Sequence, residues 1–207
     1  MNQLLIAFFL TTSLQQSFSS FSYCRENSRG PFELQCVDLD AAGKGNVKIK
    51  RRDADTISVD VQLSAAARGR FAAVIAGTNN LEQGSSYESE RKVGDLGKKR
   101  LAIELPEGRR EATFNYSTRK EVADLGSFFD ALINQETLVL DIATALQFDR
   151  LGIPKRLEQI ENELKAGRIG DPERLIPVLD KIAADQRLVN FARTKAGVLK
   201  EQILGKK

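Results

Sequence analysis

Hydrophobic and polar residues alternate with a period of two through much of the region between residues 34 and 143. Val47 and Ile49 alternate with lysines, and residues 57–63 carry an apolar side chain at every second position. This period is typical of strands that bury one face. Turn-forming Gly, Asn and Asp residues separate the runs, which favours an antiparallel sandwich or barrel. Further strands are predicted at residues 71–76, 101–105, 112–116 and 138–142.

The period changes to that of a helix after Gly152. Ile153, Leu157, Ile160 and Leu164 lie on one stripe of a helix. A second helical stretch follows Asp171 and Pro172, which are typical of an N-cap and a first helical position. We therefore predict a helical tail over 153–207 that covers its own sandwich, with a partner surface or an oligomerisation helix as the alternative.

An apolar run, Leu4 to Leu10, lies at the N-terminus, and Ser20 and Ser22 occupy the small-residue positions before Tyr23. This pattern indicates a cleaved secretory signal over residues 1–22, followed by an N-terminal arm over residues 23–33. A short buried helix or strand is the alternative. The run is shorter than a bilayer span, so we expect a secreted, extracellular protein with no membrane contact after cleavage.

Export would place the two cysteines, Cys24 and Cys36, in an oxidising compartment, where we expect them to form a disulfide. Two unpaired thiols are the alternative. Asn115 begins an Asn-Tyr-Ser pattern that would permit glycosylation, although it lies in a predicted strand. Both expectations depend on the predicted signal.

The formal net charge of the chain is +3, and it is unevenly distributed. Residues 150–207 carry 13 basic and 8 acidic side chains, an excess of +5, which leaves 18 basic and 20 acidic side chains before them. A mild excess without interleaved aromatic residues is more typical of a solvated face than of a nucleic-acid footprint. We therefore expect no nucleic-acid partner.

The run Glu90 to Gly97, ERKVGDLG, resembles the end of the zinc loop in copper–zinc superoxide dismutases. Weaker similarities precede and follow it in the same order as in that family. They lie at residues 35–37, 45–47, 57–76, 138–141 and 149–152. The resemblance implies a mainly β fold, an antiparallel Greek-key sandwich over residues 34–152, with a C-terminal helical extension.

The metal ligands that the resemblance implies are degenerate. Val74 and Ala76 stand where that family has copper histidines, Lys92 replaces a zinc histidine, Asp141 replaces another copper histidine, and only Asp95 matches. The chain has no histidine at all. Copper sites of this kind need imidazole ligands, so we expect no metal, no cofactor and no dismutase activity.

The resemblance also implies that electrostatic attraction of the superoxide anion is lost, because Glu136 replaces the arginine that draws this anion toward the copper. We therefore predict a secreted superoxide dismutase-like pseudoenzyme that acts as a binding or regulatory scaffold for an unknown protein partner. One alternative is a metal-binding protein or enzyme that uses carboxylates on the same scaffold. Its candidates are Asp38, Asp40, Asp95 and Asp141. The other alternative is an assembly module that acts through the helical tail.

Overall fold

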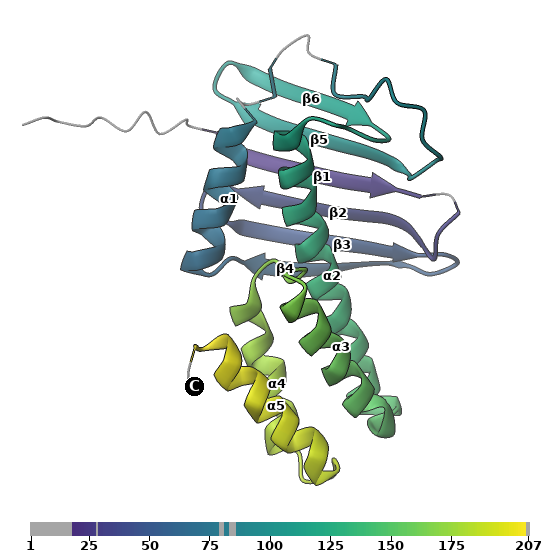
Figure 1. Cartoon of the computed structure of the whole chain (residues 1–207), viewed down its shortest axis with the longest axis vertical. Helices are drawn as coiled ribbons and strands as arrows, with labels where there is room; N and C mark the ends of the chain where they lie inside the picture. The colour runs from purple at the N-terminus through teal and green to yellow at the C-terminus, as the bar shows by residue number, and fades with distance from the viewer. Residues whose placement is uncertain (1–17, 28, 79–80, 83–85, 206–207) are drawn as a thin grey trace, which may run out of the picture.

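The computed structural model describes residues 18–27, 29–78, 81–82 and 86–205. Its central element is a single six-stranded sheet in which all neighbouring strands are antiparallel, in the order β4-β3-β2-β1-β5-β6 (Figure 1). The strands are β1 (Ser20–Glu26), β2 (Phe32–Asp40), β3 (Lys44–Arg51), β4 (Thr56–Gln62), β5 (Lys98–Leu105) and β6 (Gly108–Phe114).

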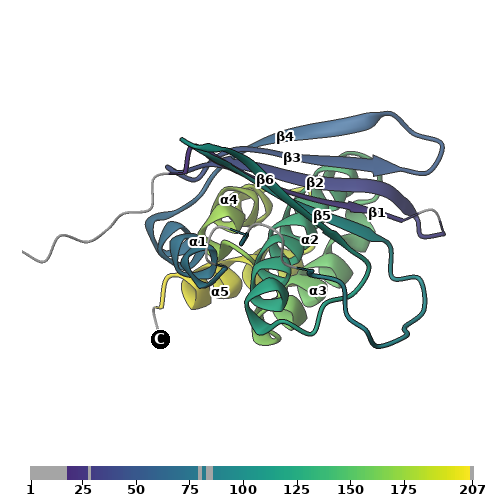
Figure 2. The ribbon, with the colours of Figure 1, turned by 90° about the horizontal axis from the view of Figure 1, so that it is seen from above.

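The described helices all lie on one side of this sheet, and no described helix covers the other side, which we call the open face (Figure 2). The strand alternation explains the difference, because neighbouring residues point to opposite faces. In β1, Phe21 and Tyr23 are buried on the helix side, while Ser22 lies on the open side. In β2, Val37 and Leu39 are likewise buried under the helices. The sheet therefore contributes one apolar face to the core.

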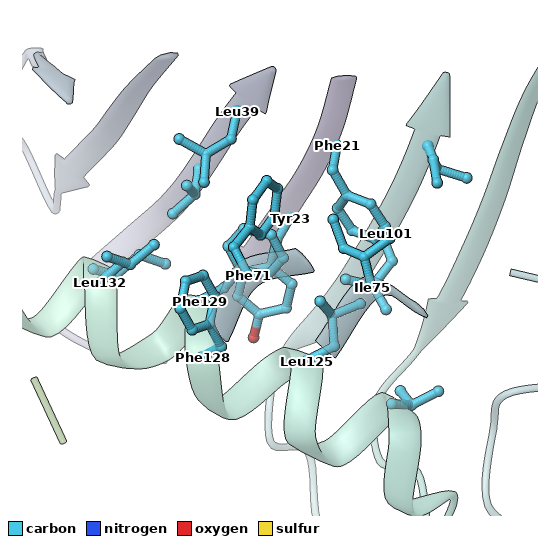
Figure 3. Packing of buried hydrophobic residues seen from close by; sticks show 14 of the residues in the cluster. Phe21, Tyr23, Leu39, Phe71, Ile75, Leu101, Leu125, Phe128, Phe129 and Leu132 are labelled. Carbon is cyan, nitrogen blue, oxygen red and sulfur yellow. The ribbon is translucent and has the colours of Figure 1, made fainter. Parts of the chain in front are cut away.

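Helices α1 (Ala65–Gly77) and α2 (Lys120–Phe148) cover that apolar face. Their contact with the sheet is a cluster of aromatic rings (Figure 3). The ring of Phe129 lies 5.6 Å from that of Phe21 and 5.4 Å from that of Tyr23, while Phe71 of α1 packs against Phe128. Such large buried rings dominate the energy of a core, so this cluster fixes how α2 crosses the sheet.

Beyond the sheet, the second half of α2 packs with α3 (Ile153–Lys165), α4 (Ile176–Ala184) and α5 (Asn190–Ile203). We call this group, with the short 3₁₀ helices η1 (Arg150–Gly152) and η2 (Pro172–Leu175), the helical subdomain. It has its own apolar core, to which Ile142, Ile160 and Leu179 belong. The predicted helical tail is therefore present, but it packs on α2 and on itself, whereas the prediction had it covering a sandwich.

The predicted Greek-key sandwich is wrong, because the described residues form one open antiparallel sheet with helices on one face. Two predicted strands, residues 71–76 and 138–142, lie inside helices. Phe71 and Ile75 are buried at the spacing of one helical turn, and α1 begins where the Ser64 hydroxyl accepts a hydrogen bond from the amide of Ala67. Continuous apolar runs do not distinguish a buried strand from a buried helix.

The segment expected to be an N-terminal arm forms most of a central strand, since β1 lies between β2 and β5. The expected signal lies mostly outside the described residues, but its last residues, Ser20 to Ser22, belong to β1. Phe21 is 1% exposed and stacks on Phe129. A cut before Tyr23 would remove that ring from the core. None of the described helices combines the length and apolar character of a bilayer span.

A chain of polar contacts around the buried Glu136 and Asp171, here called the polar junction, joins the helical subdomain to β4 and to the start of α1. Glu136 of α2 accepts hydrogen bonds from Arg174 Nε at 2.8 Å and Gln135 Nε2 at 2.9 Å. The Gln135 Oε1 atom accepts from the Asp171 amide at 2.7 Å. Asp171 Oδ2 in turn accepts from the amide of Ser64 at 2.7 Å, so its side chain does not cap η2. These contacts hold the two cores at a fixed position relative to each other.

Candidate ligand-binding cleft

The positions matched to metal ligands do not converge in the structure. Val74 and Ala76 lie on α1, Lys92 and Asp95 are exposed in the segment between α1 and β5, and Asp141 lies on α2, where it pairs with Arg51 of β3. Asp95 Oδ1 accepts a hydrogen bond from the amide of Gly97, which is a turn contact. Without the sandwich, the resemblance no longer places these residues in one site.

Glu136, matched to an anion-guiding arginine, is buried in the polar junction. Its side chain is 2% exposed and pairs with Arg174. A buried and paired carboxylate of this kind neither attracts nor repels a diffusing anion at the surface. The structure therefore gives Glu136 a role in joining the two parts of the molecule.

The carboxylates of the metal-binding alternative are also dispersed. Asp38 pairs with Lys48 on the open face of the sheet, and Asp40 Oδ1 accepts the amide of Lys44 in a turn. Asp141 belongs to a helix on the other side of the sheet. Within the described part of the chain, no group of three or more His, Cys, Asp or Glu residues could hold a metal ion.

Asn115, the proposed glycosylation position, lies just after β6 and not in a strand. Its Oδ1 atom accepts a hydrogen bond from the amide of Leu96 at 2.8 Å, and its Nδ2 atom donates to the carbonyl of Gly94 at 3.0 Å. A glycan would replace one of the two hydrogens on Nδ2, the atom that donates this hydrogen bond. Glycosylation of Asn115 stays a prediction.

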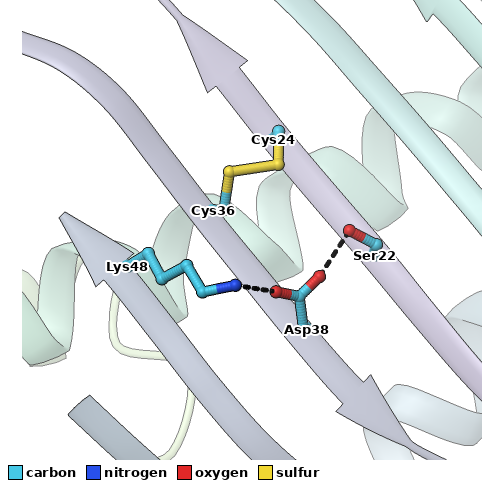
Figure 4. Close-up of a disulfide and its surroundings, with 5 residues drawn as sticks. All are labelled: Ser22, Cys24, Cys36, Asp38 and Lys48. Carbon is cyan, nitrogen blue, oxygen red and sulfur yellow. Dashed lines mark hydrogen bonds and ion pairs between the residues drawn. A yellow bond between two sulfur atoms is a disulfide. The ribbon is translucent and has the colours of Figure 1, made fainter. Parts of the chain in front are cut away.

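The predicted disulfide between Cys24 and Cys36 is confirmed (Figure 4). The two cysteines are direct partners in the ladder between β1 and β2 and lie on the open face of the sheet. Beside them, Asp38 accepts hydrogen bonds from Ser22 at 2.6 Å and Lys48 at 3.1 Å. The bond therefore joins two adjacent strands from the side opposite the aromatic core.

A cleft of about 490 Å³ opens where the ends of β1 and β2, the middle of α2 and the C-terminal end of α3 meet. We call it the α2 cleft. Volumes of this size are typical of small-molecule sites, which occur where structural units meet. The lining consists of Arg25, Phe32, Gln35, Ser127, Asp130, Ala131, Ile133, Asn134, Thr137, Glu163, Gly167 and Arg168.

The sheet side of the α2 cleft is built around Arg25. This residue follows Phe21 and Tyr23 on the helix-facing side of β1, so its stem continues the buried row and its guanidinium reaches the cleft. One terminal nitrogen donates to Gln35 Oε1 on β2, and the other lies 3.3 Å from Asp130 Oδ1 on α2. The guanidinium is therefore held in place between the strand and the helix.

Asp130 also binds the buried Tyr23, whose hydroxyl donates to Asp130 Oδ1 at 3.0 Å. The pKa of Tyr23 is raised, first by burial and second by the negative charge of Asp130, so the phenol stays protonated and remains a hydrogen-bond donor. This contact links the aromatic core to the wall of the cleft. It fixes the position of the Asp130 carboxylate.

The helical side of the α2 cleft is built around Glu163 of α3. Arg168 donates to both Glu163 oxygens, at 2.8 and 2.9 Å, and Asn134 of α2 donates to Oε2 at 3.0 Å. Hydrogen bonding from Arg168 is the main cause that lowers the pKa of Glu163. Asn134 Nδ2 also reaches the carbonyl of Arg168 at 3.2 Å. The turn after α3 is thereby bound to α2.

The α2 cleft thus presents two guanidiniums, two carboxylates and two amides next to the apolar surfaces of Phe32 and Ile133. Sequence reasoning singled out none of these residues, because they come from four separate segments. One local signal was present. Arg25 occupies an inward position of an alternating strand, where a charged residue is expected to serve a specific contact.

Comparisons of the chain with protein-family models and with curated proteins found no match.

Proposed function

We propose that this protein is an exported binding protein that holds a small zwitterionic ligand, such as a short peptide, in the α2 cleft. The observation that carries the proposal is the convergence of paired charged groups and amides from β1, β2, α2 and α3 on one cavity of about 490 Å³. Several fixed polar groups beside apolar surface are typical of small-molecule sites.

The charge balance of the lining favours a ligand of mixed charge. Arg25 and Arg168 carry two positive charges, and Asp130 and Glu163 carry two negative charges, so the lining is neutral overall. A ligand of one sign would meet as many like charges as opposite ones. A zwitterion can place its carboxylate toward Arg25 or Arg168 and its ammonium toward Asp130, with apolar side chains against Phe32.

Export is supported by the disulfide, because such bonds persist in oxidising compartments, and by the apolar run near the N-terminus. The secreted location stays a proposal, as does the absence of a nucleic-acid partner.

The experiment compares thermal unfolding with three kinds of probe: dipeptides, the dicarboxylate succinate, and the polyamine spermidine. At about 100 times Kd, a bound ligand adds about 2.7 kcal/mol to stability, which is about 5–10 °C in Tm for a chain of this size. We expect dipeptides to produce this shift and the other two probes to produce none. Absence of a shift with dipeptides, or a larger one with a singly signed probe, contradicts the proposal.

Two substitutions on one helix provide the matched variants. Ala131→Phe places a ring in the α2 cleft without removing any polar contact, and Ala143→Phe places the same ring on an exposed position of α2. The dipeptide shift should disappear in the first variant and persist in the second. A folded Ala131→Phe protein that still binds dipeptides would place their site elsewhere.

A further inference from the structure

One end of the helical subdomain carries exposed apolar side chains. Phe148, at the end of α2, is 75% exposed, and Leu151, in η1, is 86% exposed. Val189, at the N-cap of α5, is 49% exposed, and Phe191, in its first turn, is 63% exposed. The end of α2 and the start of α5 lie at the same end of the molecule, away from the sheet (Figure 1). We call these four residues the apolar tip.

The sequence segments that contain the apolar tip are rich in basic residues. Segments 148–156 and 185–193 contain five basic and two acidic residues, an excess of +3. The acidic residues are Asp149 and Asp185, and the basic ones, which we call the basic rim, are Arg150, Lys155, Arg156, Arg187 and Arg193. The end of α2 and the start of α5, which belong to these two segments, lie at the same end of the molecule (Figure 1). The charge of Arg150 also helps to lower the pKa of Asp185, although the hydrogen bonds from Arg187 are the larger cause.

Exposed apolar residues together with basic neighbours favour one partner surface over another: a second copy of the chain is disfavoured, and an anionic surface is favoured. An isologous dimer through the tip would bring two basic rims together, and their repulsion opposes the contact. An anionic surface instead attracts the rim while its interior accepts the apolar side chains. Exposed aromatic and aliphatic residues next to basic ones are typical of proteins that lie at a membrane interface.

We propose that the apolar tip docks the protein on an anionic lipid bilayer, with Phe148 and Leu151 entering the headgroup region and the basic rim facing lipid phosphates. This contact differs from the sequence-based expectation of no membrane contact after signal cleavage. It does not depend on the proposed ligand in the α2 cleft, which lies at the opposite end of α3 from η1.

The test is co-sedimentation of the full chain with vesicles of phosphatidylcholine, with and without phosphatidylglycerol. We expect binding to the anionic vesicles that weakens as NaCl rises from about 0.05 to about 0.5 M, because salt screens the rim. Phe148→Ser with Leu151→Ser should weaken this binding at least about tenfold, since each side chain loses apolar surface that the bilayer would bury. Both residues are exposed, so this variant should fold, which circular dichroism checks.

The matched control is Ile57→Ser with Leu96→Ser, which removes two exposed apolar side chains from β4 and from the segment before β5. It should bind anionic vesicles as the unmodified chain does. Equal binding by the tip variant overturns the proposal, as does failure of the unmodified chain to bind either vesicle. Self-association in light scattering that the tip variant abolishes would assign the apolar tip to a second copy and also overturn the proposal.

Discussion

Replacing Arg174 with methionine tests the polar junction between the helical subdomain and the sheet. The substitution removes two hydrogen bonds to Glu136, at 2.8 and 3.3 Å, and one to the carbonyl of Asp60 in the edge strand β4. Glu136 would then be a buried carboxylate, 2% exposed, with Gln135 as its remaining donor among the described residues. Most of the expected loss of stability therefore comes from leaving a buried charge unpaired, and little of it comes from losing a surface contact.

The expected cost follows from the burial of the two partners. Removing one partner of a buried ion pair typically costs about 3–5 kcal/mol. The Arg174 side chain is 23% exposed, so water partly screens the pair, and we expect a smaller cost of about 2–3 kcal/mol. Glu136→Gln should cost only about 1 kcal/mol, because the amide oxygen still accepts hydrogen bonds. The double variant should cost less than the sum by about 1–2 kcal/mol, since no buried charge remains.

The assay is urea unfolding at neutral pH followed by far-UV circular dichroism, because the chain contains no tryptophan. Lys120→Met is the matched control. It breaks the exposed pair with Asp124 and should change stability by less than about 0.5 kcal/mol. If Arg174→Met costs no more stability than this control, or if the effects of the two junction substitutions are additive, the polar junction does not hold the helical subdomain to the sheet.

Three further results are expected. Replacing Cys24 and Cys36 with serine should destabilise the protein by about 3 kcal/mol in the chain-entropy model, measured by urea unfolding; no change would show that the bond does not restrict the unfolded chain. The pKa of Glu163 is lowered on folding, so the ionised carboxylate stabilises the folded protein above the unfolded pKa of about 4.3, and this stabilisation is lost as the pH falls through the folded pKa. Arg168→Gln should therefore cost more stability at about pH 6 than at about pH 3. An equal cost at both pH values would contradict the assigned ion pair between Arg168 and Glu163. Secreted material should begin at or before Ser19, because Phe21 is part of the core, and N-terminal sequencing that finds Tyr23 first in folded protein would contradict this.

The sequence alone predicted the elements whose pattern is local. The alternation at Val47 and Ile49 and at residues 57–63 marks β3 and β4, and the stripe from Ile153 to Leu164 marks α3. The period of a buried face needs only neighbouring residues to be visible. The disulfide was predicted from the expected compartment and from there being only two cysteines.

Only the tertiary structure decided what the continuous apolar runs become and which residues meet. Phe71 and Leu138 lie in runs that suit a strand or a helix equally, and packing against the sheet and the helical subdomain selects the helix. The α2 cleft joins Arg25 to Arg168, 143 positions later in the chain, and no local pattern relates them. Their proximity depends on how α2 crosses the sheet, which the aromatic cluster around Phe129 fixes through contacts between distant segments.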